Sequence, residues 1–362
     1  MTDPSGDEVE TTGRRKTATI VDVARQAAVS TATVSRVLNG NYPVAAGTRD
    51  RVLHAVDDLG YAANANARAL VRAGSRTIGV VILEIVDPFF GYILRGVERA
   101  TTSSNRVAMV ASTGGDPERK IELLDRMTEQ RADAVILVGG SHSDRSYQRR
   151  LADRARTLDR MGSVLVLCGH PPMPSTIPAR CATYDNEGGA FAATEHLLAH
   201  GHRHIVHLAG PSGLSTSDDR VDGYRRALRA RGVEPIRDLV RPGRYNRVSG
   251  YHRTQAMLAE GLHFTAVFAG NDGVAAGVYD ALDEAGLSVP GDVSIVGYDD
   301  TPESTELRPR LTTVHVPLEE MGREAVRVAT ESADSYSRQQ SGTVMLGTYL
   351  VPRDSVAAPR SG

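Results

Sequence analysis

Apolar runs alternate with amphipathic segments along most of the chain. The apolar runs predict β-strands over 77–83, 106–112, 132–140, 163–168, 179–186, 202–210, 264–270 and 292–300. Apolar residues recur at helical spacing over 90–103, 118–130, 187–200, 220–231 and 271–284. This βαβ succession predicts two α/β lobes, each a doubly wound parallel sheet with helices on both faces.

The N-terminal part follows a different pattern, which predicts three short helices around one small core. Their apolar faces are Ile20, Val23, Ala24 and Ala27, then Val34, Val37 and Leu38, then Val52, Val56 and Leu59. Thr19 and Asp22 have the spacing of a capping box, and Ser30 is placed to cap the second helix. The third helix is expected from about Thr48 to Leu59. The prediction is an all-α helix-turn-helix head.

The outer face of the second predicted helix is short and polar. It carries Thr31, Ala32, Ser35 and Arg36. Such a helix suits the major groove of DNA, where arginine forms two hydrogen bonds to guanine, so Arg36 is the expected base reader. A three-helix bundle without a DNA role is the alternative.

The charge of the chain is unevenly distributed. The segment 14–76 holds ten basic residues and four acidic ones, although the net charge of the whole chain is −2. A local positive excess is expected for a protein that contacts the phosphate backbone of DNA, although a solvated basic face gives the same pattern.

The segments TIVDVARQAAVSTATVSRVLNG (19–40) and TRDRVLHAVDDLGY (48–61) resemble the DNA-binding head of the lactose-repressor (LacI/GalR) family. The resemblance implies that Thr31, Ala32 and Arg36 select bases. It also implies that phosphates or groove edges are held by Ser30, Thr33, Ser35, Asn39 and Thr48. The short Thr31 and Ala32 would read thymine through methyl contacts. Two positions depart from the family pattern, with Ala63 in place of proline and Ala45 in place of the serine that caps the third helix.

An alanine-rich stretch between Asn64 and Gly74 predicts a helix of two to three turns. A helix this short is marginal in water unless another surface packs against it. The family resemblance identifies it as the hinge helix that enters the minor groove with its dimer mate, where Leu70 is the apolar wedge, and it adds Asn64 and Ala67 to the DNA contacts. An ordinary linker or interface leucine is the alternative for Leu70.

Four loops follow predicted strands and define the expected ligand pocket, since ligands of such lobes bind at the carboxyl ends of strands. They are DPFF (87–90), AGPSG (209–213), GND (270–272) and GYDD (297–300). The large part of the chain resembles the effector domain of the same family, which is shared with periplasmic sugar-binding proteins. The resemblance implies that the effector is held by Arg220, Asn271 and Asp299, together with Asp87, Phe89 and Phe90. Arg220 is expected just before a helix that begins with Val221. The alternatives are structural: Asn271 and Asp299 as caps, and Phe90 as core.

These expectations divide the chain into five parts. They are a disordered tail (1–17), the helix-turn-helix domain (18–62), the hinge helix (63–75), the effector-binding and dimerisation domain (76–355) and a second tail (356–362). Within the effector domain, the first lobe is expected at about 76–172 and 304–330, and the second at about 173–303 and 331–355.

Motifs for catalysis are missing from the sequence. It has no G-x-G-x-x-G after the first strand, no phosphate-binding G-x-x-x-x-G-K-[ST] and no G-x-S-x-G, so neither a cofactor nor an enzymatic activity is expected. A metal site is not expected from the histidines His196, His200, His202, His204 and His207, because a turn separates the first pair from the others. Cys168 and Cys181 are expected to be reduced packing residues.

The resulting expectation is a homodimeric repressor that binds a pseudo-palindromic operator and is controlled by a small molecule, with a sugar as the leading candidate. The acidic, polar first residues and the lack of a long apolar run predict a cytoplasmic protein with no membrane contact. A sugar-binding module for transport is the main alternative, but it leaves the basic head unexplained. Tetramer formation stays open.

Overall fold

The computed structural model describes residues 18–39, 44–59, 76–332 and 343–360. The chain forms two compact units, Met1–Ser75 and Arg76–Gly362. The predicted N-terminal tail and the predicted hinge helix, with Asn64, Ala67 and Leu70, lie outside the described residues.

The first unit contains three helices, as the sequence predicts. They are α1 (Ile20–Gln26), α2 (Thr31–Asn39) and α3 (Ala46–Asp58). Val23, Val34 and Val52 are completely buried between them. The third helix begins two residues before the predicted Thr48, because the Ala45 carbonyl already accepts hydrogen bonds from the N–H groups of Thr48 and Arg49.

The caps of these helices differ in strength. The Asp22 carboxylate accepts hydrogen bonds from the Thr19 N–H (2.9 Å) and hydroxyl (2.6 Å), and Ser30 Oγ accepts one from the Thr33 N–H (3.2 Å). Ala45, at the cap of α3, has no side-chain oxygen to do the same. The departure from the family pattern at this position therefore removes one capping bond.

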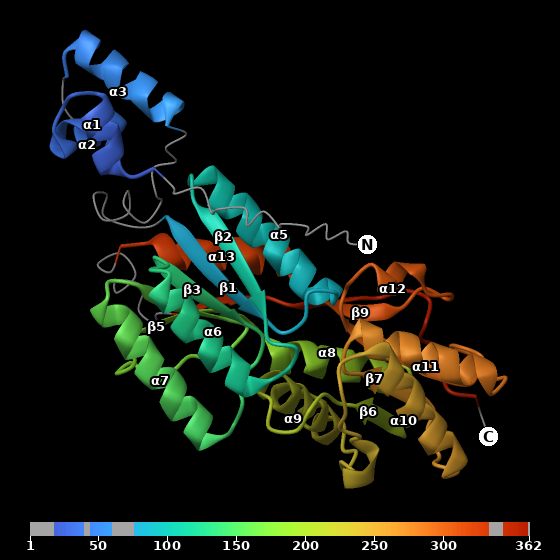
Figure 1. Cartoon of the computed structure of the whole chain (residues 1–362). Helices are drawn as coiled ribbons and strands as arrows, with labels where there is room; N and C mark the ends of the chain where they lie inside the picture. The colour runs from blue at the N-terminus through green and yellow to red at the C-terminus, as the bar shows by residue number, and fades with distance from the viewer. Residues whose placement is uncertain (1–17, 40–43, 60–75, 333–342, 361–362) are drawn as a thin grey trace, which may run out of the picture. The chain divides into compact units, whose positions relative to one another are not determined.

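The first lobe of the second unit is a six-stranded parallel sheet with the order β10-β5-β4-β3-β1-β2. Its strands are β1 (Thr77–Ile82), β2 (Val107–Ser112), β3 (Ala134–Val138), β4 (Val164–Cys168), β5 (Ala179–Tyr184) and β10 (Thr343–Leu346). One face is covered by α5 (Pro88–Ser103) and α13 (Leu318–Thr330), and the other by α6 (Pro117–Glu129) and α7 (Arg145–Arg160) (Figure 1).

The second lobe is a five-stranded sheet with the order β11-β9-β8-β7-β6, parallel except for its edge strand β11. Its strands are β6 (Ile205–Leu208), β7 (Ala266–Ala269), β8 (Ser294–Asp299), β9 (Thr312–His315) and β11 (Tyr349–Val351). The faces are covered by α8 (Asn186–Ala199) with α9 (Ser215–Ala230), and by α10 (Arg247–Ala259) with α11 (Asp272–Glu284). Two short helices, η1 (Arg237–Leu239) and α12 (Glu303–Glu306), lie in its loops. The predicted class, a helical head followed by two α/β lobes, is confirmed.

The division of strands between the lobes differs from the prediction. Strand β5 pairs with β4 in the first sheet, and β10 pairs with β5 there, although both were expected in the second lobe. Strand β9, expected in the first lobe, pairs with β8 in the second. The chain therefore passes between the lobes at Asp185, at 316–317 and at 347–348, so three segments connect them.

Two further predictions are corrected. Helix α9 begins at Ser215, so Arg220 lies inside it and not before it. The predicted C-terminal tail is packed up to residue 360, because the Ala357 carbonyl accepts a hydrogen bond from Ser294 Oγ (3.1 Å) and lies 2.9 Å from His202 Nε2. The sequence analysis also omitted the helices α7, α10 and α13.

Candidate functional site

A cavity lies between the two lobes of the second unit and is lined by residues of both. A cavity between two lobes is a common place for a small-molecule site. All six residues predicted to hold the effector line it: Asp87, Phe89 and Phe90 from the first lobe, and Arg220, Asn271 and Asp299 from the second. The structure thus brings together residues that lie more than two hundred positions apart in the sequence.

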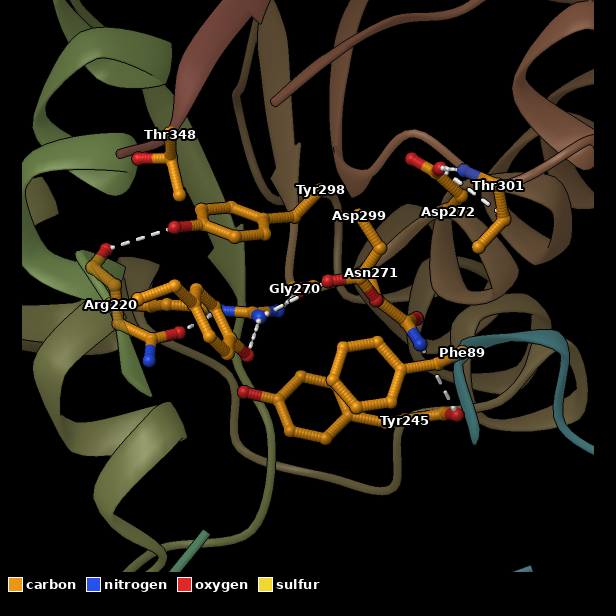
Figure 2. A network of polar contacts seen from close by, with 12 residues as sticks. Phe89, Arg220, Tyr245, Gly270, Asn271, Asp272, Tyr298, Asp299, Thr301 and Thr348 are labelled. Carbon is orange, nitrogen blue, oxygen red and sulfur yellow. Dashed lines mark hydrogen bonds and ion pairs between the residues drawn. The ribbon is translucent and has the colours of Figure 1, made fainter. Parts of the chain in front are cut away.

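Arg220 is the most extensively bonded residue of the cavity. It is 3% exposed. Its Nε–H donates to Asn186 Oδ1 (3.0 Å), and one terminal nitrogen donates to the Gly270 carbonyl. The other terminal nitrogen donates to Tyr184 Oη and Asp299 Oδ1, both at 3.1 Å (Figure 2). Every nitrogen of the guanidinium therefore has a defined partner, which fixes its orientation.

The guanidinium also contacts the hinge between the lobes through Tyr298. Its central carbon lies 3.7 Å from the centre of the Tyr298 ring, and Figure 2 shows the two groups stacked. The Tyr298 hydroxyl donates to the carbonyls of Asp185 and Asn186, each at 3.2 Å, and Thr348 Oγ1 donates to the same Asp185 carbonyl (3.1 Å). Tyr298 therefore connects Arg220 to the crossing at Asp185, whose carbonyl is shared with Thr348 of a second crossing.

Burial dominates the electrostatics of this end of the cavity. Burial opposes the charge of Arg220, but Asp299 and Tyr184 hold the pKa of its guanidinium well above the ordinary value. Burial also raises the pKa of Asp299 to about 7, against the opposing effect of Arg220. Asp299 and Asp300 have positive φ angles of 102° and 56°, a conformation that disfavours side chains and that clusters at functional sites. The ion pair between Arg220 and Asp299 is preorganised, and such a pair can bind adjacent hydroxyl groups.

Several cavity residues have a structural role as well. Asn271 Oδ1 caps α11 by accepting the Val274 N–H (2.8 Å), and Asp87 caps α5 by accepting the Phe89 N–H (2.9 Å). Phe90 is 5% exposed and belongs to the core. The structural alternatives considered for Asn271 and Phe90 are therefore correct, yet both residues also line the cavity. Phe89 supplies the more accessible apolar face, and Figure 2 shows it entering from the first lobe.

Other residues of the cavity were missed. They are Leu83, Lys120, Val138, Gly139, Gly140, His142, Tyr184, Leu214, Thr216 and Tyr245. Tyr245 precedes α10, a helix that the sequence analysis omitted. Lys120 left a signal, because it is one of only two lysines in the chain and occupies the first turn of a predicted helix. The predicted loop 209–213 does not line this cavity, which is reached instead by Leu214 and Thr216.

The loops that follow β3 and β6 join the lobes beside the cavity. The Ser143 N–H donates to the Gly213 carbonyl (2.8 Å), and the Ser215 N–H donates to the Ser141 carbonyl (2.9 Å). Next to these bonds, a Cβ atom on Gly140 would lie 3.0 Å from both Leu214 Cδ1 and Thr216 Oγ1. The close approach of the lobes therefore depends on the missing side chain at position 140.

Replacement of Gly140 by valine is expected to weaken ligand binding about tenfold or more, because the added methyl groups keep the loops apart. The measurement is a titration of the full-length protein with its effector, once a ligand that changes operator binding is found. Gly91→Ala is the control, since nothing lies within 4 Å of a Cβ at Gly91. Equal affinities of Gly140→Val and wild type would show that the lobes do not need to approach this closely.

The predicted base-reading face lies on the outside of α2. Thr31, Ala32 and Arg36 are exposed, and Val34 and Val37 are buried on the opposite side. Ser30 is exposed at the start of the helix, whereas Thr33, Ser35 and Thr48 are half-buried, and Asn39 is the last residue of α2. A short polar face that carries an arginine is thus available to a partner.

The histidines near α8 have separate partners. His202 Nδ1 lies 2.9 Å from Thr265 Oγ1, and the buried His207 stacks on Phe268 with ring centres 4.4 Å apart. His196 and His200 lie next to each other, with ring centres 4.5 Å apart. Across the described residues, no cluster of three or more possible metal ligands occurs. Cys168 and Cys181 are buried thiols, and Cys181 Sγ donates to the His170 carbonyl (3.3 Å).

Among the helices that the structure describes, none is long and apolar enough to cross a membrane.

Residues 19–64 match the model of the lacI family of bacterial regulatory proteins, and residues 194–356 match a periplasmic binding protein-like domain. Over 343 residues the chain is 34% identical to the HTH-type transcriptional regulator GalR of Escherichia coli (strain K12), covering 94% of this chain and 96% of that protein. The chain belongs to the lacI family. As a lacI-family member it is a DNA-binding transcriptional regulator, with the first unit as its DNA-binding head.

Two solved structures are similar to this chain over most of its length. The lac repressor dimer bound to operator and the anti-inducer ONPF has a TM-score of 0.77 at 27% identity, covering 95% of this chain and all of that one. The complex of the transcriptional regulator CelR with cellobiose has a TM-score of 0.66 at 30% identity, covering 93% of this chain and 99% of that one.

Proposed function

We propose that this lacI-family regulator is a homodimeric repressor whose affinity for a pseudo-palindromic operator is controlled by a sugar or related metabolite in the cavity between the lobes. One observation carries the proposal: a cavity lined by polar and apolar residues of both lobes occurs in the same chain as a helix-turn-helix head with an exposed Arg36. The activity is binding and not catalysis, and it takes place in the cytoplasm, where the operator DNA lies.

The head reads DNA through α2. Arg36 contacts a guanine in the major groove, Thr31 and Ala32 contact thymine methyl groups, and phosphates or groove edges are held by Ser30, Thr33, Ser35, Asn39 and Thr48. Asn64, Ala67 and Leu70 contact the minor groove between the half-sites. Two heads related by a twofold axis require an operator with the same symmetry.

Effector binding acts through the angle between the lobes. A ligand that contacts Arg220 and Asn271 of one lobe and Phe89 of the other stabilises the closed arrangement. The hinge helices form only when correctly spaced, so a small lobe movement changes operator affinity. A transport module with the same large domain would have no use for the head.

Selection from a random-duplex pool by the full-length protein tests this function. At moderate salt the retained DNA is expected to share one palindromic consensus, because non-specific binding weakens steeply with salt. The same selection is repeated with candidate sugars, which are expected to release the selected site. A retained fraction without any consensus, with and without sugars, would contradict the proposal.

Replacement of Arg36 by alanine is expected to weaken binding to the selected site by about 1 to 3 kcal/mol and to relax base choice at one operator position. Arg25→Ala is the control: Arg25 lies on α1, where it pairs with Asp22, so base choice should not change. Competition among single-base variants of the operator measures both effects. Equal weakening of all sequences by Arg36→Ala would remove its role as a base reader.

A further inference from the structure

Lys120 is a buried cation at the edge of the effector cavity. It is the fourth residue of α6, on the face of the first sheet that α6 shares with α7 (Figure 1). It is 5% exposed, and it lines the same cavity as Arg220 and Asp299. Its place in the first turn of α6 is unfavourable for a positive charge, because the partial charge of a helix N-terminus is also positive.

The amino group of Lys120 has neither a hydrogen bond nor an ion pair with the residues that the structure describes. Its Nζ lies 6.0 Å from the centre of the Tyr147 ring. Arg220, which lines the same cavity, is by contrast paired with Asp299. A buried charge without a partner is costly, so such groups are rare unless a ligand completes the site.

The acidic residues around Lys120 form hydrogen bonds with other groups. Glu118 forms two hydrogen bonds with Arg150 (2.5 and 2.6 Å). Asp116 and Asp144 accept the N–H groups that begin α6 and α7. Asp87 caps α5, and burial, followed by the nearby Glu303 and Glu84, raises the pKa of its carboxyl group. None of these carboxylates neutralises Lys120.

Two histidines lie near Lys120 and supply no negative charge to it. His142 lines the cavity, and His170 is completely buried with no hydrogen bond to either ring nitrogen among the described residues. Burial and the charge of Lys120 lower the pKa of both imidazoles. Burial also lowers the pKa of Lys120 to about 8, which leaves it mainly protonated at neutral pH. The two ends of the cavity therefore differ: one holds a neutralised Arg220–Asp299 pair, the other an unpaired cation.

We propose that the effector is an anion, a sugar or polyol that carries a phosphate or carboxylate group, and that Lys120 binds this group while Arg220, Asn271 and Asp299 bind the hydroxyls. This inference rests on the proposed function, since it names the ligand class of the same cavity. A bound anion would supply the missing partner of Lys120 and would offset the cost of a positive charge that is buried at a helix N-terminus.

Calorimetric titration of the full-length protein tests the inference with matched compounds. One set is D-glucose, glucose 6-phosphate and D-gluconate; another is D-galactose, galactose 6-phosphate and D-galacturonate; inorganic phosphate is added alone. An anionic member is expected to bind about 10 to 100 times more tightly than its neutral parent, as for a hydrogen bond to a charged group. The phosphate and carboxylate members of each set show which anion the site takes.

Variants of Lys120 assign the effect to this side chain. Lys120→Met is expected to remove the 10 to 100-fold preference for the anion over its neutral parent, roughly the contribution of one charged hydrogen bond. Lys120→Arg should restore part of the preference. Arg119→Met is the matched control, because Arg119 is the exposed neighbour of Lys120 on α6. A preference for anions that survives in Lys120→Met would overturn the inference.

Release of the selected operator separates the two proposals. If a neutral sugar releases operator from wild type and from Lys120→Met equally well, the repressor function stands and the anionic effector is wrong. If the operator is bound but neither neutral nor anionic compounds change that binding, effector control itself is wrong and the inference falls with it.

Discussion

Replacement of Arg220 by methionine is expected to destabilise the effector domain by about 3 to 5 kcal/mol, because it leaves Asp299 as an unpaired buried charge. Three more groups lose their donor: Asn186 Oδ1, the Gly270 carbonyl and Tyr184 Oη. Denaturant unfolding of the full-length protein, followed through the large unit, measures the loss. Burial raises the pKa of Asp299 to about 7 even with Arg220 present, so the deficit should be largest above pH 7 and should shrink as the pH falls below 7, where Asp299 becomes protonated.

A second variant separates the ion pair from the rest of the network. Arg220→Met with Asp299→Asn is expected to recover part of the lost stability, since no buried charge is left without a partner. Arg225→Met is the control on the same helix: Arg225 forms only a surface pair with Asp222 at 3.8 Å, a contact that contributes about 1 kcal/mol or less. Strict additivity of the two substitutions would show that Arg220 and Asp299 do not depend on each other.

The same variants are expected to lose the response of operator binding to effector. Arg220 touches Tyr298, and the Tyr298 hydroxyl bonds to the crossing at Asp185, so the side chain connects the cavity to the segments about which the lobes rotate. A ligand that holds Arg220 therefore acts on the hinge directly. If the double variant regains stability but not the response, the functional role of Arg220 is separate from its structural one.

The position of the cavity could be predicted from the sequence because it follows from the strands. Runs such as 77–83 and 264–270 read as buried parallel strands, and the loops at their carboxyl ends form the site. Periodicity, however, does not assign a strand to a sheet. Strands β5 and β9 are largely buried and would suit either sheet, and β10 is a half-buried edge strand, so the lobes to which these strands belong became evident only from the observed pairing.

The family resemblance supplied the residues that local patterns leave ambiguous. Asn271 has the spacing of a helix cap and Phe90 that of a core residue, and both roles are real. The ends of the predicted strands placed their loops at the pocket, and the resemblance assigned these two residues to the ligand. Helix α7 is different, because Tyr147, Leu151, Ala155 and Leu158 recur at helical spacing and are all buried. That signal was present in the sequence and was overlooked.

Lys120 could not have been assigned from the sequence, since its partners depend on tertiary structure. A lysine in the first turn of a helix is normally exposed, and its neighbours Glu118 and Asp116 suggest local ion pairs. In the structure those carboxylates bond to other groups, and the side chain lies in the interior. The missing partner is a property of the fold and not of the local sequence.

Replacement of Lys120 by methionine is expected to stabilise the ligand-free protein at neutral pH by about 2 to 3 kcal/mol. Burial lowers the pKa of Lys120 from 10.5 to about 8, a difference that corresponds to about 3 kcal/mol against the charged form. Methionine has a similar length and no charge to bury. Denaturant unfolding of both proteins without sugars or phosphate measures the gain.

The dependence of this gain on pH identifies its cause. Below pH 8 the folded wild type carries the full unfavourable charge, so the gain of Lys120→Met is constant there. Between pH 8 and 10.5 the folded protein loses the proton before the unfolded chain does, so wild type is stabilised and the difference closes.

Arg119→Met should show neither the gain nor the pH dependence. A gain that stays constant up to pH 10.5 would mean that better packing, and not removal of a charge, stabilises the variant. A substitution that stabilises the protein while removing anion binding would mark Lys120 as a residue retained for its ligand and not for the fold.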